Sequence, residues 1–239
     1  MKTTEIEHFN KLLEKANHIW WGHETKAGQE RLNRKGKILI EYLKPTPNFK
    51  ILEIGCGLGV LTEQIITCDA EIIATDINLK MLELVRERIK AKNVSFVYAD
   101  SEKLEFSDNT FDAVIGNSIL HHLNISLALP EIRRVLKPGG KLMFFEPNML
   151  NPHIFLERHV PYIRKKLDVS PDETAFYRWQ IKKDLLKADF KNIKVTPFDF
   201  LYPLIPDSFI NLVKRIGSVL EKTPIIKEIA GSLIIKAEK

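Results

Sequence analysis

Three glycines and three polar residues stand at regular places in the first half of the chain. Gly55, Gly57 and Gly59 alternate with other residues directly after a short apolar stretch. Glycine tolerates backbone angles that bring the main chain close to a ligand, so this loop indicates a binding site. Three polar residues each close a later apolar stretch, namely Asp76, Asp100 and Asn117.

Two kinds of nucleotide cofactor fit a glycine loop followed by an acidic residue. Asp76 lies 21 positions beyond Gly55, where a carboxylate can accept the two hydroxyls of a ribose. A dinucleotide loop has the pattern G-x-G-x-x-G around a pyrophosphate, but here Val60 replaces the third glycine and Glu53 precedes the loop. The Glu53 carboxylate would repel a pyrophosphate and suit the ammonium group of a methionine moiety. The residues therefore favour S-adenosylmethionine (SAM) over NAD.

The elements that would position these residues alternate between strands and helices. Apolar strands are expected at 51–54, 71–75, 94–99, 111–115, 141–145, 192–199 and 232–237. Helical spacing is found at 5–17, 28–43, 61–67, 79–91, 126–136 and 180–188. Nearly continuous apolar strands separated by helices indicate a parallel sheet covered on both faces, which binds ligands beyond the carboxyl ends of its strands. The glycine loop and the three polar residues fall at those ends.

Four stretches resemble the class I SAM-dependent methyltransferases, in the broad group of ubiquinone/menaquinone-biosynthesis and small-molecule enzymes. They are ILEIGCGLGVLT (51–62), ATDIN (74–78), YADSEKLEFSDNTFDAVIGNSILHHL (98–123) and EIRRVLKPGGKLMFFEPN (131–148). The resemblance implies an α/β, Rossmann-like, doubly wound sheet of seven strands in the order 3-2-1-4-5-7-6, the last strand antiparallel. We expect a single domain over 1–239, with an N-terminal helical lid at 1–45, a SAM-binding core at 48–150, and insertions at 151–179 and 200–230 that form a lid on the acceptor side.

The resemblance also implies roles for individual residues. The glycine loop would surround the methionine part of SAM, with Cys56 mainly filling space. The second strand end would bind the ribose, the third would contact adenine, and the fourth would contact the methionine end by its backbone. Arg31 resembles an arginine that holds the SAM carboxylate in quinone-pathway relatives; a surface arginine is the alternative. The residues expected to bind SAM are Glu53, Gly55, Cys56, Gly57, Gly59, Asp76, Ile77, Asp100, Ser101, Asn117 and Arg31.

Methyl transfer from SAM is an in-line displacement that leaves S-adenosylhomocysteine, and the protein mainly aligns the acceptor and excludes water. A base is needed only where the acceptor must lose a proton. His121 and His122 follow the fourth strand, near where the methyl group would emerge. An imidazole is suited to this proton transfer, so His122 is the candidate base and proximity alone is the alternative. For Glu146 we expect a structural contact.

The sequence favours a small-molecule acceptor over a nucleic acid. The segment after the fourth strand lacks the Asn/Asp-Pro-Pro-aromatic tetrapeptide of amino-methylating nucleic-acid enzymes, and neither Cys56 nor Cys68 is placed to attack a pyrimidine. Two cysteines suggest no metal site. The net charge is +5, and the whole basic excess lies beyond residue 150. The aromatic and basic insertions would either cover a hydrophobic acceptor, with a membrane surface as a further partner, or simply pack onto the sheet.

Three alternatives remain open. They are a SAM-binding protein without catalysis, an RNA-directed methyltransferase and an NAD-linked oxidoreductase. The first residues contain no apolar run of the kind found in secretory signals, and no run approaches the roughly 18 apolar residues of a membrane span. We therefore expect a cytoplasmic protein.

Overall fold

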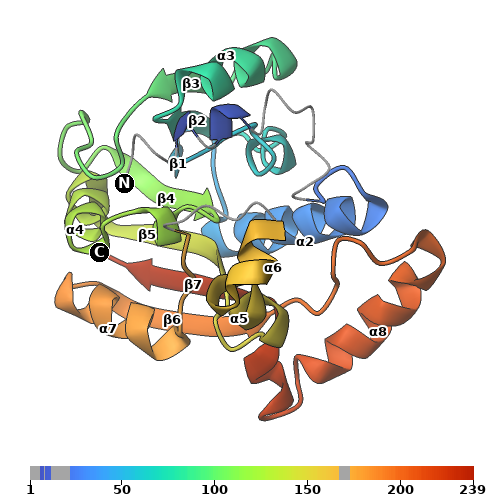
Figure 1. Ribbon diagram of the computed structural model, residues 1–239. Helices are drawn as coiled ribbons and strands as arrows, with labels where there is room; N and C mark the ends of the chain where they lie inside the picture. Colours follow the sequence, from blue (N-terminus) through green and yellow to red (C-terminus); the bar gives the residue numbers. More distant parts are fainter. Residues whose placement is uncertain (1–5, 8, 12–21, 167–172) are drawn as a thin grey trace.

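A seven-stranded sheet forms the centre of the protein (Figure 1). The computed structural model describes residues 6–7, 9–11, 22–166 and 173–239. The strand order is β3-β2-β1-β4-β5-β7-β6. All pairs from β3 to β5 are parallel, and β7 runs antiparallel to both β5 and β6. The fold class, the strand order and the antiparallel last strand expected from the sequence are confirmed.

The strands are β1 (Lys50–Ile54), β2 (Glu71–Asp76), β3 (Val94–Tyr98), β4 (Phe111–Asn117), β5 (Leu136–Pro147), β6 (Lys191–Phe198) and β7 (Ser232–Glu238). The α-helices are α2 (Lys26–Leu43), α3 (Leu79–Arg88), α4 (Ile125–Val135), α5 (Pro152–His159), α6 (Pro161–Lys166), α7 (Arg178–Lys187) and α8 (Ile210–Leu220). The 3-10 helices are η2 (Thr62–Gln64), η3 (Leu120–His122), η4 (Asp207–Phe209) and η5 (Ile226–Ile229). Every expected strand is present, and β5 begins earlier than expected because its pairing with β4 starts before the glycine turn and resumes after a register shift.

The helix expected at 61–67 is wrong. The chain forms only the short η2 there, and its backbone bonds span three residues, as in the pairs Gln64 N to Leu61 O and Ile65 N to Thr62 O. The segment continues with Ile65, Ile66 and Thr67. Side chains branched at Cβ lose rotamer freedom in a helix, which weakens the helical preference of such a run.

Side chains alternate between the two faces of the sheet, and each face has its own helices. One face of β1, β4 and β5 packs with α4 and α7, and its buried residues include Leu52, Val114 and Phe144. The opposite face packs with α2 and contains Ile51, Ala113 and Phe145. The cluster around α3 joins that second face through Ala74 of β2. This period-two burial on both faces explains why the strands read as continuous apolar runs.

The expected lid at 1–45 and the first insertion are only partly among the described residues. Positions 1–5, 8, 12–21 and 167–172 lie outside them. The rest of the first insertion holds α5 and α6, and the second holds η4, α8 and η5. The amphipathic segment expected near 207–220 is confirmed, while the functional division into core and lids stays a prediction. In the described part of the chain, no helix is both long and apolar enough to cross a membrane.

Candidate active site

The loop after β1 turns sharply back at the carboxyl edge of the sheet. Its three glycines have positive φ angles, 61° at Gly55, 52° at Gly57 and 74° at Gly59. A Cβ atom at Gly55 would lie 2.3 Å from Cγ1 of Ile119, and one at Gly59 would lie 2.5 Å from Cγ2 of Val85. Glycine is therefore required at these two places by both the backbone angle and the close neighbours.

The Asp76 carboxylate holds this loop in place. Its Oδ2 accepts a hydrogen bond from the backbone N–H of Gly57 at 2.8 Å, and its Oδ1 accepts one from Asn78 at 2.8 Å. Burial raises the pKa of the Asp76 carboxyl, while the backbone donors oppose that rise. An ionised carboxylate has about four acceptor positions, so about two remain for the hydroxyls of a ligand.

Glu53 lies behind the loop. It is 1% exposed, and its Oε2 accepts a hydrogen bond from the Thr62 hydroxyl at 2.7 Å. Burial raises its pKa to about 7. Glu53 is not part of the cavity wall described next, so the structure brings it near the expected methionine site but does not expose it there.

A cavity of about 820 Å³ opens at this edge of the sheet. Ten of the residues singled out from the sequence line it, and Glu53 and Gly59 do not. Gly59 packs against α3 instead. The ten lining residues are Arg31, Gly55, Cys56, Gly57, Asp76, Ile77, Asp100, Ser101, Asn117 and His122. The fold therefore brings together side chains that are spread over nearly a hundred positions of the sequence.

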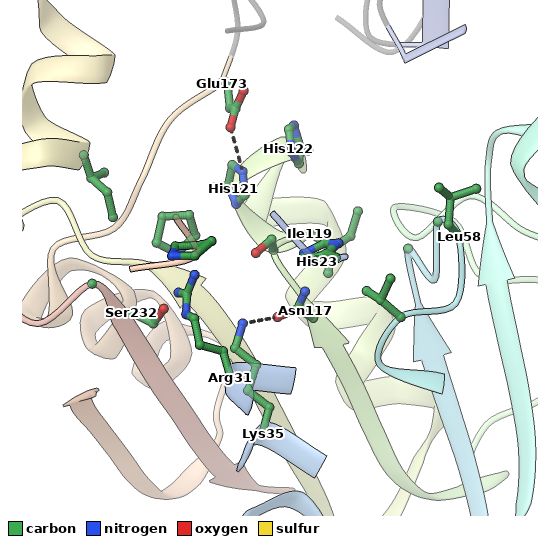
Figure 2. Close-up of a pocket in the computed structure, with 18 of the residues that line it drawn as sticks. His23, Arg31, Lys35, Leu58, Asn117, Ile119, His121, His122, Glu173 and Ser232 are labelled. Atoms are coloured by element: carbon green, nitrogen blue, oxygen red, sulfur yellow. Dashed lines mark hydrogen bonds and ion pairs between the residues drawn. The ribbon is translucent and has the colours of Figure 1, made fainter. Parts of the chain in front are cut away.

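Helix α2 adds positive charge to the cavity. The Thr25 hydroxyl accepts a hydrogen bond from Gly28 N and begins the helix, and Arg31 and Lys35 then share one face because they are four residues apart. Figure 2 shows the two side chains next to each other, with Lys35 Nζ donating to Asn117 Oδ1 at 2.6 Å. Burial and the neighbouring charge of Arg31 lower the pKa of Lys35 to about 7.

Asp199 and His23 complete the surroundings of these two cations. The Arg31 Nε donates to Asp199 Oδ2 at 2.5 Å. Burial and the charges of Lys35 and Arg31 lower the pKa of His23 to about 4, so its ring is neutral. Arg31 is therefore paired with Asp199, whereas Lys35 hydrogen-bonds an uncharged amide, which leaves this part of the cavity suited to an anion.

A buried network surrounds His121 at the opposite end of the site. Glu146 Oε2 lies 2.7 Å from His121 Nδ1, and Glu173 Oε1 lies 3.8 Å from His121 Nε2. Arg158 Nη2 donates to Glu173 at 2.5 Å. Burial alone would lower the pKa of His121, but the two carboxylates raise it to about 9. Burial would also raise the pKa of Glu173, but His121 and Arg158 lower it to about 2. His121 is thus a cation.

Glu146 also fixes the loop that follows β4. Its Oε1 accepts hydrogen bonds from the backbone N–H groups of Ile119 at 3.0 Å and Leu120 at 2.8 Å. It is 1% exposed and absent from the cavity wall. The structural contact expected for Glu146 is confirmed.

The described residues include one group with the spacing of metal ligands. Ring nitrogens of His121 and His122 and a carboxylate oxygen of Glu173 all lie within 4.8 Å of one another. However, the protonated His121 has no free lone pair, and Arg158 already neutralises Glu173. A metal ion would have to displace a proton and a guanidinium group, so the cluster is better explained as a balanced ionic network.

His122 lies next to His121 in this cluster and is also close to Glu173. Its centroid lies 4.0 Å from that of His121 and 5.8 Å from that of Phe9. It lines the cavity, as His121 does. Because His121 is already protonated, His122 is the better placed of the two rings to accept a proton from a ligand.

Sequence reasoning missed several residues of the site. Lys35 had a signal, because it lies one helical turn beyond Arg31. Glu173 and Arg158 had no such signal, because they come from an insertion without a motif. Asp199 had none either, because it follows the end of β6 and meets a partner far away in sequence. Arg31 and Asp199, for example, are separated by 168 positions.

Comparisons with known proteins agree with this geometry. A family described as a methyltransferase domain matches residues 52–144. The demethylmenaquinone methyltransferase of Corynebacterium urealyticum is 32% identical over 163 residues, which cover 65% of this chain and 68% of that protein. A ubiquinone/menaquinone biosynthesis C-methyltransferase of Ectopseudomonas mendocina is 39% identical over 118 residues, 46% of each chain. The chain thus spans about two thirds of the first relative and less than half of the second.

Solved structures support the same fold. A SAM-dependent methyltransferase from Thermotoga maritima superposes with a TM-score of 0.69 at 19% identity, covering 98% of this chain and 99% of that one. Phosphoethanolamine N-methyltransferase 2 of Haemonchus contortus, in complex with SAM, has a TM-score of 0.62 at 18% identity over 86% of this chain and 52% of that one. With its glycine loop, strand-end carboxylates and matching relatives, the chain belongs to the class I SAM-dependent methyltransferases, enzymes that take their methyl group from SAM.

Proposed function

We propose that this enzyme methylates a small, largely apolar acceptor that carries an ionisable ring hydroxyl, as a quinol or phenol does. The composition of the cavity wall carries this proposal. The glycine loop and Asp76, which suit a nucleoside, line the same cavity of about 820 Å³ as apolar side chains and the rings of His121 and His122. Ligand sites commonly measure about 300–1,000 Å³, so there is room for an acceptor beside a nucleoside. The names of the two sequence relatives, which refer to quinones, support the same class of acceptor.

On the cofactor side, each part of the wall has a proposed task. Asp76 accepts the ribose hydroxyls with its remaining lone pairs, and Ile77 packs on adenine, whose edge meets Asp100 and Ser101. The backbone of Gly55, Gly57 and Asn117 contacts the methionine part. When bound, SAM supplies a methyl group on a sulfonium sulfur, which the acceptor displaces in line.

We assign the carboxylate of the methionine part to the basic side of α2. Arg31 and Lys35 both line the cavity, and among the described residues the buried Lys35 has an uncharged amide, that of Asn117, as its hydrogen-bond partner. An anion next to Lys35 would restore its full positive charge. Arg31 already shares its charge with Asp199, so Lys35 should contribute more to the binding of the carboxylate.

The other wall suits an apolar ring with a hydroxyl group. We propose that His122 removes the hydroxyl proton and that the imidazolium of His121 stabilises the oxyanion from close by. Deprotonation raises the electron density of the ring and of its oxygen, which makes either a better nucleophile. Apolar residues that line the cavity include Ile119, Leu123, Ile154, Phe200, Leu201 and Leu204.

Incubation with methyl-labelled SAM tests the proposal directly. A short-chain demethylated quinol, a histamine-like amine and total RNA would be offered in parallel, and the methylated product would be identified by mass spectrometry. We expect label in the quinol alone. Label in the amine or the RNA would contradict the proposed acceptor class, and SAM binding without transfer to any fraction would favour a binding protein without catalysis.

A further inference from the structure

Helix α8 carries an apolar stripe on its outer side. Four large apolar side chains, the first at its N-cap and three within it, recur at intervals of three and four residues, which places them on one side of the helix. Each is about half exposed or more. They are Phe209 at 54%, Leu212 at 52%, Ile216 at 48% and Val219 at 62%. Monomeric proteins seldom expose a continuous apolar stripe without a use for it.

The residues of the outer stripe are not the ones with which α8 packs on the rest of the protein. A second set of apolar residues on α8, offset by one position, already packs on the protein: Ile210 is buried with Ala27 and Leu201, and Val213 packs against that group. Gly217 is buried as well, and a Cβ atom at this position would lie 3.4 Å from Cβ of Phe200. Because the inner set fixes the rotation of the helix, the outer stripe must face away from the protein.

The charges beside the stripe are basic and unpaired. The helix contains no acidic residue. Lys214 pairs with Glu30. Arg215 on the helix and Lys222, two residues beyond its last residue, have no ion pair within the described part of the chain. The nearby acids are already used: Asp207 pairs with Lys26, and Glu221 pairs with Arg34. The outer side therefore presents apolar residues next to uncompensated positive charge.

The stripe lies close to the mouth of the cavity. Tyr202 and Leu204 line the cavity and are also exposed at 44% and 61%. Their segment leads directly into η4 and α8, and its Leu201 packs under Ile210. Figure 1 shows α8 at the periphery of the molecule, away from α3 and β3. A flat surface could therefore reach the helix without meeting the sheet.

We propose that α8 docks on the surface of an anionic lipid bilayer. Phe209, Leu212, Ile216 and Val219 enter the boundary between headgroups and acyl chains, and Arg215 and Lys222 meet lipid phosphates. An apolar stripe bordered by basic residues and free of acids is the pattern of interfacial helices. The docked helix holds the cavity mouth next to the apolar phase. This inference stands without the proposed acceptor, since it concerns a surface outside the cavity.

Vesicle co-sedimentation of the full chain tests the proposal. The vesicles are phosphatidylcholine with or without phosphatidylglycerol, and neither SAM nor an acceptor is needed. We expect binding to the anionic vesicles that weakens with added salt, because screening acts on the basic residues. The variant L212S/I216S/V219S, or the variant R215E/K222E, should lower the partition coefficient at least about tenfold.

Matched variants elsewhere control for general effects. L127S/L186S changes leucines of similar exposure on α4 and α7, and K182E/K183E reverses two exposed charges on α7. Both should bind vesicles like the unchanged chain, and all variants should keep its far-ultraviolet circular dichroism. The three α8 positions lie outside the cavity, so turnover of a water-soluble acceptor should also stay the same. No binding to either vesicle at low salt would overturn the proposal. Loss of a dimer by the α8 variant, without vesicle binding, would instead identify the stripe as an interface between two copies.

Discussion

The two ends of the cavity are built in different ways. The end proposed for the cofactor is made by the backbone: three glycines, the N–H groups held by Asp76, and strand ends that follow one another along the chain. The end proposed for the acceptor is made by charged side chains from distant segments, as in the network of His121, Glu146 and Glu173. A site built from backbone geometry tolerates few substitutions but keeps its shape over a wide range of pH. An ionic network depends on each of its charged side chains and therefore on pH. The two ends should therefore fail separately.

Removal of Glu146 should produce the largest effect. In Glu146→Ala, the His121 cation and two backbone N–H groups lose their buried partner, which costs about 3–5 kcal/mol of unfolding free energy. Urea unfolding measures this loss. The control Glu71→Ala removes an exposed pair with Lys50 and should cost less than about 1 kcal/mol. Equal losses in both variants would show that the acceptor-end network is not a structural unit.

The same network makes stability depend on pH. The pKa of His121 is about 9 in the folded protein, above its ordinary 6.5, so its stabilising effect is complete below about pH 6.5 and is lost as the pH rises through 9. Unfolding free energy should fall over that interval, and the slope should shrink in Glu146→Gln. Glu173, with a pKa of about 2, loses its effect only as the pH falls from about 4.5 through 2.

At the cofactor end, Gly55→Ala should weaken SAM binding by at least about a hundredfold. The positive φ and the contact with Ile119 both resist a side chain there, and each effect amounts to about 1–3 kcal/mol. Calorimetry measures the affinity. Gly139→Ala is the control, because it has φ of 72° but no atom within 4 Å of the added Cβ. If both variants bind SAM equally well, close approach is not what the glycine loop provides.

His122→Ala should separate chemistry from cofactor binding. We expect kcat to fall about a hundredfold, the usual contribution of a general base, with the Kd for SAM unchanged. An unchanged kcat would leave positioning alone as the source of catalysis.

Lys35 should give the smallest effect and a characteristic pH dependence. The pKa of Lys35 is about 7 in the free protein. Above that pH the Lys35 amine must therefore take up a proton before it can pair with the SAM carboxylate. Affinity should therefore fall about tenfold between pH 7 and pH 9, as one titrating group allows. Lys35→Arg keeps its charge and should remove most of this fall. Identical pH profiles would assign the SAM carboxylate to another residue.

The two ends also differ in how well the sequence predicted them. Motif spacing predicted that Asp76, Asn117 and the glycine loop lie at the carboxyl ends of their strands, as they do in the structure, and the resemblance carried by the same stretches implied the sheet topology. The Glu173 partner of His121 and the Asp199 partner of Arg31 could not be found, because one lies in an insertion and the other follows β6, and only tertiary packing brings them to the site. The short η2 was missed because apolar spacing indicates a helix even where branched side chains disfavour one.

The affinity of Asp76→Ala for SAM, measured by calorimetry, tests the central claim most directly. This carboxylate both holds the glycine loop and faces the ligand, so its loss should raise the Kd about a hundredfold, given about 1.5–3 kcal/mol for each charged hydrogen bond. Asp112→Ala is the matched control. Asp112 lies at the start of β4, away from the carboxyl edge of the sheet, and accepts hydrogen bonds from the backbone of Lys50 and the side chain of Lys137. An unchanged Kd in Asp76→Ala would contradict the assignment of this cavity as the SAM site.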